Sequence, residues 1–219
     1  MQIATTFSHA ILLVYAALFP VINPIGGAPV FLNFTRFCAP AQRYALARKV
    51  AVSSFLLLLG SMFIGSHVLS FFGIKLPVVQ IGGGIIVMAL AWKLLNAPTA
   101  PHFSEAGPTP SPIVPEVFYP LTLPLTVDPG ALSVAVTIGS HHPEAATIER
   151  LLLLASSAIT GLLAISLTIY LCYRFAENLV TLLGHDGMRV IIRLSSFILF
   201  CIGIQILWTG WYELAHSSL

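Results

Sequence analysis

Two short motifs place a polar side chain directly before a proline, with a glycine close behind. Residues 23–27 read Asn-Pro-Ile-Gly-Gly, within a stretch that has no Asp, Glu, Lys or Arg from residue 1 to residue 35. Residues 128–131 read Asp-Pro-Gly-Ala. Proline lacks an N–H group and disfavours a helical conformation in the residue before it, so each motif predicts a break in a helix. Asn and Asp are also preferred helix N-caps, so each motif predicts that a half-helix begins there.

A half-helix that begins inside a membrane can bind an anion, because its N-terminus carries about half a positive charge. Asp128 would supply the opposite charge. Burial favours its neutral form and the helix dipole favours its anion, a balance that suits exchange of a proton. The charged form would instead hold a substrate amine or Na⁺. We therefore expect Asp128 to couple transport to H⁺ or Na⁺. The expected substrate-binding residues are Asn23, Pro24, Gly26, Gly27, Asp128, Pro129 and Gly130.

Both motifs also have a simpler interpretation. Proline kinks are common in membrane helices, where neighbouring helices satisfy the backbone groups that the proline leaves unpaired. Asp128 could be only a buried helix cap. The similar depth of the motifs favours a site. At 1.5 Å per residue, Asn23 lies about 22–24 Å along its segment and Asp128 about 16 Å along its own, both near the bilayer midplane. Broken helices at corresponding places in two halves indicate a transport site.

The elements that must position these motifs are membrane-spanning helices. Of 219 residues, 57% are hydrophobic and 8% are charged, and the mean hydropathy is +0.93, whereas soluble domains carry about 25% charged residues. A spanning helix needs about 20 apolar residues. The sequence predicts six such segments, at 8–35 (broken at 23–24), 46–72, 76–95, 117–139, 151–174 and 190–212.

These segments predict an all-α membrane protein in which residues 1–219 form a single membrane domain. Residues 1–95 would form a first three-helix repeat and residues 119–219 a second. Each half has an odd number of spans, so the two copies must have opposite orientation, as in an inverted repeat. Residues 96–118 contain six prolines, which prevent a helix, and we expect them to form a cytoplasmic linker.

The basic residues predict an orientation. The side that holds both termini would carry only Lys75 and Arg150, and the other side would carry eight basic residues. Basic loops stay in the cytoplasm, so both termini are expected to face the periplasm or cell exterior, with the protein in the inner (plasma) membrane. The charges lie at helix ends and form no basic stripe, so no nucleic-acid partner is expected. The eight residues are Arg36, Arg43, Arg48, Lys49, Lys93, Arg174, Arg189 and Arg193.

Other polar residues are weaker candidates for chemistry. Hydroxyl residues flank Asp128, but Ser and Thr in helices often bond to their own backbone. Residues 141–149 contain two histidines and two glutamates, where a zinc site is the alternative to an exposed loop. We expect no metal and no other cofactor. Asp128 has no second membrane aspartate beside it and the sequence lacks hydrolase motifs, so we do not expect an enzyme. The flanking residues are Thr122, Thr126, Ser133 and Thr137.

Several motifs, in order along the chain, resemble the MarC family of bacterial and archaeal membrane proteins, which are related to LysE-type exporters. They are residues 23–26, 76–84, 120–130 and 184–205. The resemblance covers nearly the whole chain except residues 96–118. It implies a six-span transporter with a 3+3 inverted repeat, and some members move small neutral amino acids such as glycine and alanine. This chain departs from the family at residues 128–130, where Asp-Pro-Gly replaces the usual Gly-Pro-Gly.

The expected function is therefore secondary transport of small solutes, in particular small neutral amino acids, at a midplane site between two broken helices. The partners would be the substrate, H⁺ or Na⁺, and the lipid bilayer, and the sequence leaves the oligomeric state open. The alternative is a membrane scaffold or stress-related protein without transport activity.

Overall fold

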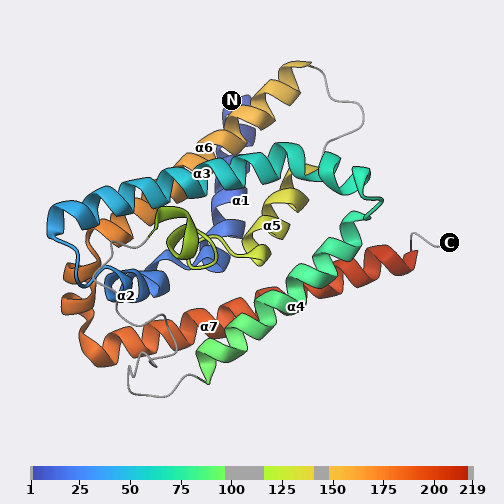
Figure 1. Cartoon of the computed structure of the whole chain (residues 1–219). Helices are drawn as coiled ribbons and strands as arrows, with labels where there is room; N and C mark the ends of the chain where they lie inside the picture. The colour runs from blue at the N-terminus through green and yellow to red at the C-terminus, as the bar shows by residue number, and fades with distance from the viewer. Residues whose placement is uncertain (1, 97–115, 141–147, 217–219) are drawn as a thin grey trace.

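The computed structural model describes residues 2–96, 116–140 and 148–216, which form an all-helical fold (Figure 1). No strand is found among these residues, so the predicted fold class is confirmed as far as an all-helical membrane protein. Most of the linker 96–118 and the histidine pair at 141–142 lie outside the described residues. The helices are α1 Gln2–Ile22, α2 Pro24–Phe34, α3 Pro40–Phe71, α4 Leu76–Leu95, the π-helical segment η1 Val117–Thr122, α5 Pro129–Ser140, α6 Ile148–Arg174 and α7 Ala176–His216.

By length and composition, the described residues contain 4 helices that can each cross a membrane. They are α3, α4, Leu152–Arg174 of α6 and Val190–His216 of α7. A fifth span is formed if Phe7–Ile22 and α2, which are bent by 44° relative to each other, are taken together. The chain is therefore a multi-pass integral membrane protein. The six-span inverted repeat stays a prediction.

The predicted span at 117–139 is not one continuous helix. Helix η1 ends at Thr122 and α5 begins only at Pro129, so the backbone leaves the helical path over residues 123–128. Pro120, Pro124 and Pro129 recur at spacings of four and five residues, and each removes an N–H group that a continuous helix would use. The interruption is therefore wider than the single break predicted at Asp128.

The last predicted span, 190–212, falls within the candidate span Val190–His216. Helix α7 as a whole begins at Ala176, and its backbone is interrupted at Gly184, which has φ 62° and ψ 177°. Glycine adopts a positive φ without steric cost, which explains why the bend falls at this residue. Helix α7 also contacts α2.

Helices α4 and α7 pack side by side and form one part of the structure (Figure 1). Glycine permits this contact, because a side chain on Gly84 would lie 2.8 Å from the carbonyl oxygen of Gly203. A side chain on Gly210 would lie 2.7 Å from the carbonyl oxygen of Pro77. Such backbone contacts between small residues are typical of helix pairs in membranes.

The other part of the structure is formed by α1, α3 and α6, with α3 and α1 both packed against α6. The two short helices bridge the two parts, because α5 contacts both α3 and α4, and α2 contacts both α6 and α7. The start of α2 and the start of α5 therefore lie in the interior of the molecule (Figure 1).

Candidate functional site

Asn23 occupies the break between α1 and α2 and caps α2. Its backbone has φ 45° and ψ 59°, a left-handed conformation that Asn adopts more readily than most residues. Its Oδ1 atom accepts a hydrogen bond from the N–H of Gly26 at 3.2 Å, and its carbonyl accepts one from the N–H of Gly27 at 2.9 Å. Pro24 has no N–H. Asn23 thus accepts the hydrogen bonds of the N–H groups of Gly26 and Gly27, and its Nδ2 group is a polar donor at this break.

Asp128 caps α5 with the same pattern of hydrogen bonds, but without the positive φ of Asn23. Its Oδ1 atom accepts a hydrogen bond from the N–H of Ala131 at 2.7 Å, and its carbonyl accepts one from the N–H of Leu132 at 3.1 Å. The residue is buried, with 7% of its surface exposed. One carboxylate oxygen therefore serves the cap, and the other can accept from a further partner.

A cavity of about 380 Å³ lies where the two capped helices begin. This volume is at the lower end of the range for small-molecule sites, about 300–1,000 Å³. Both expected motifs reach it. Five of the seven expected substrate-binding residues line the cavity, namely Asn23, Gly26, Gly27, Asp128 and Pro129.

The other two expected residues lie close to the cavity but not on its wall. Pro24 is buried at the first position of α2. Gly130 is buried in the first turn of α5, and a side chain there would collide with Val87 of α4. Both residues shape the capped helix starts, so their expected role in contacting substrate has no direct support in the geometry.

The remaining wall of the cavity is almost entirely apolar. Helix α2 contributes Val30 and Phe34, which share a face with Asn23 because they follow it at helical spacing. Helix α4 contributes residues four positions apart, Ile86 and Leu90 among them, and α7 contributes residues such as Leu199. At 1.5 Å per residue, Phe34 lies about 16 Å along α2 from the break. The cavity thus has a polar end at the two caps and an apolar end between α2 and α4.

Tyr173 of α6 lies behind this wall. It is fully buried, and its hydroxyl group lies 3.0 Å from the hydroxyl of Thr126, which lines the cavity. Its ring stacks on Phe31 of α2 with 4.5 Å between ring centroids. Tyr173 was not predicted from the sequence, because a lone tyrosine in an apolar span resembles any core aromatic. Thr126 was a weaker candidate; it bonds to its own backbone at Leu121 as expected, and also to Tyr173.

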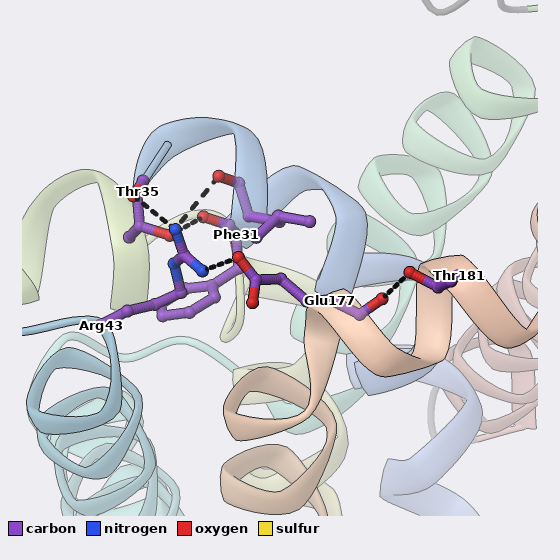
Figure 2. Close-up of polar contacts among 6 residues, drawn as sticks. Phe31, Thr35, Arg43, Glu177 and Thr181 are labelled. Carbon is purple, nitrogen blue, oxygen red and sulfur yellow. Dashed lines mark hydrogen bonds and ion pairs between the residues drawn. The ribbon is translucent and has the colours of Figure 1, made fainter. Parts of the chain in front are cut away.

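A second polar cluster joins the end of α2 to the beginnings of α3 and α7 (Figure 2). The buried Arg43 forms an ion pair with Glu177 and donates a 3.4 Å hydrogen bond to the carbonyl of Thr35. The Thr35 hydroxyl donates in turn to the carbonyl of Phe31 at 2.8 Å. From the sequence, Arg43 was expected only to be one of the basic residues that set the orientation. No cluster of His, Cys, Asp or Glu suited to a metal ion is found in the described parts of the chain.

The chain is similar in sequence to a known family of membrane proteins. Residues 8–215 match the family described as MarC family integral membrane protein. The chain is 28% identical over 201 residues to UPF0056 membrane protein YvbG of Bacillus subtilis, which covers 90% of this chain and 92% of the relative. It is 26% identical over 206 residues to UPF0056 inner membrane protein MarC of Salmonella paratyphi A, which covers 91% of this chain and 93% of the relative. No solved structure matches the chain. The chain therefore belongs to the MarC family of integral membrane proteins.

Proposed function

We propose that this protein is a secondary transporter of small solutes, and that the substrate binds in the cavity between the two capped helix starts. One observation carries the proposal: Asn23 and Asp128, from separate parts of the chain, line the same cavity. A transporter of the 3+3 inverted-repeat type places its site where the two repeats meet, at discontinuous helices. In the proposed arrangement, residues 1–95 and 119–219 are the repeats, as in transporters related to the LysE-type exporters.

The polar groups at the cavity favour a zwitterion as the substrate. The Nδ2 group of Asn23 and the positive end of the α2 dipole attract a carboxylate. The second carboxylate oxygen of Asp128 accepts from an ammonium group. The apolar wall then accepts an uncharged side chain. The proposed substrates are therefore small neutral amino acids such as glycine and alanine, with Asp128 coupling their movement to H⁺ or Na⁺.

The proposed location is the inner membrane, with both termini outside the cytoplasm. Two features support it: the eight-to-two distribution of basic residues across the predicted loops, and a relative that is named an inner membrane protein.

The test is uptake by purified protein reconstituted into liposomes. Vesicles loaded with unlabelled alanine are expected to accumulate labelled alanine from outside, saturably, and an inward H⁺ or Na⁺ gradient is expected to increase net uptake. Protein-free liposomes are the control for leakage, and labelled glutamate and lysine are the control for selectivity. If no neutral amino acid shows saturable uptake above protein-free liposomes, the proposal fails and a scaffold without transport activity becomes the better account.

A further inference from the structure

We propose that Tyr173 is a positioning residue that holds the interrupted segment before α5 against α2, and so sets the geometry of the substrate cavity. The inference rests on the transport function proposed above. Tyr173 does not line the cavity. It acts through two neighbours that do, Thr126 and Gly27.

The ring of Tyr173 has a fixed position. It is completely buried and lies nearly parallel to the ring of Phe31, with an angle of 14° between the ring planes. The hydroxyl group can therefore reach only one place. The Thr126 hydroxyl has a single proton and lies 2.7 Å from the carbonyl oxygen of Leu121, to which it donates. Tyr173 must then be the donor in the 3.0 Å bond between the two hydroxyl groups.

Gly27 allows the phenol to come this close to α2. A methyl group on Gly27 would lie 2.7 Å from the Tyr173 hydroxyl oxygen. The phenol therefore sits between the first turn of α2 and Thr126. One hydroxyl group thus connects α6, the capped start of α2 and the segment that leads to Asp128.

The segment before α5 depends on such side-chain contacts. Residues 123–128 are not helical, and the N–H groups of Thr126 and Val127 both bond to the same carbonyl, that of Thr122. Thr126 lies two residues before Asp128. Loss of the Tyr173 hydrogen bond is therefore expected to loosen the position of the Asp128 carboxylate relative to Asn23, without changing any group that touches substrate.

Two matched substitutions test the inference. Tyr173→Phe removes only the hydroxyl group and keeps the ring that stacks on Phe31. Tyr15→Phe is the control, because the Tyr15 hydroxyl also pairs with a threonine hydroxyl of α6, at Thr168 and 3.1 Å, while neither residue lines the cavity. Each variant is reconstituted for alanine uptake, and each is also studied by hydrogen–deuterium exchange of the amides of residues 122–131.

The expected result is specific to Tyr173→Phe. The KM for alanine rises about three- to ten-fold, the range set by one neutral hydrogen bond, with little change in maximal rate. The amides of residues 122–131 exchange faster. The Tyr15→Phe variant keeps the parent KM and the parent exchange rates. Thr126→Val combined with Tyr173→Phe is expected to have no larger effect on exchange than Thr126→Val alone, because Thr126→Val already removes the bond to Tyr173 together with its own bond to Leu121.

The two proposals can fail separately. If the parent protein transports no amino acid, the transport proposal fails, and the exchange measurement alone decides the role of Tyr173. If the parent transports alanine and Tyr173→Phe shows a parent-like KM, the positioning role is refuted. Exchange in residues 122–131 that is no faster in Tyr173→Phe than in Tyr15→Phe refutes it as well, with or without transport.

Discussion

Asn23 and Asp128 cap two different helices with the same kind of side-chain hydrogen bond and line one cavity. In each cap a side-chain oxygen accepts from the N–H three residues further on, Gly26 at 3.2 Å and Ala131 at 2.7 Å. A carboxylate near the middle of a membrane costs about 2.5–3.5 kcal/mol on the lower of the available scales. A cationic partner in the cavity would offset that cost, which is the physical basis of the proposed site.

Gly27→Ala is expected to destabilise the protein by about 1–3 kcal/mol, because the added methyl group would lie within contact of the Tyr173 hydroxyl oxygen. The free energy of unfolding in detergent measures this. Gly60→Ala in α3 is the control, since no atom lies within 4 Å of its added methyl group. The cost of Gly27→Ala should be smaller in a Tyr173→Phe background, where the nearest ring atoms are 3.4 and 3.5 Å away. An equal cost in both backgrounds would contradict the steric explanation.

Ile86→Trp is expected to remove most of the saturable uptake of alanine, because the larger side chain fills the apolar part of the cavity that Ile86 lines. Ile85→Trp is the matched control. It adds the same volume to the neighbouring position, which is similarly exposed but does not line the cavity. Initial rates of uptake in reconstituted liposomes give the comparison. Equal rates for the two variants would show that the cavity is not on the substrate pathway.

Glu177→Gln is expected to lower the free energy of unfolding by about 1 kcal/mol. Arg43 is buried and loses its ion-pair partner, but the side chain of Glu177 is 59% exposed, so solvent reduces the effect. Glu213→Gln on the same helix is the control, because Glu213 forms no ion pair with the described residues. Equal stability of Glu177→Gln and the parent in thermal unfolding would mean that the cluster of Figure 2 does not contribute to stability.

The orientation of the chain can be measured with reporter fusions. A reporter that functions only in the periplasm is expected to be active when it is joined after Leu219. A reporter that functions only in the cytoplasm is expected to be active when it is inserted in residues 96–118. The reason is the excess of basic residues on the linker side of the predicted topology. Cytoplasmic activity of the fusion after Leu219 would reverse the proposed orientation.

The features predicted well from sequence are local ones. Helix α1 ends at Ile22 and α2 begins at Pro24, where the proline rule puts a break. Helix α4 has the bounds Leu76–Leu95, which match the predicted segment 76–95. Both signals depend only on a proline or on an uninterrupted apolar run. The membrane class is confirmed, and it follows from composition alone. The MarC family resemblance is also confirmed, and it follows from short motifs that occur in order along the chain.

The features missed from sequence are contacts between distant residues. Nothing in the spacing of Tyr173 or Thr126 shows that their hydroxyl groups meet, because the contact depends on how α6 packs against the segment before α5. The pairing of Arg43 with Glu177 is of the same kind. The wide interruption at 123–128 was underestimated for a different reason: the effects of Pro120, Pro124 and Pro129 combine over a short stretch.

The most direct test of the central claim is uptake of labelled alanine by reconstituted Asp128→Asn, with H⁺ and Na⁺ gradients imposed separately. Asn also caps helices well, so the variant is expected to keep the parent stability. Asp128→Gly, which restores the usual family residue, should transport with altered ion dependence or substrate preference. We predict that Asp128→Asn loses uptake, or loses the response of uptake to the ion gradient. Uptake equal to that of the parent under every gradient would show that Asp128 is only a helix cap, and would contradict the proposed site.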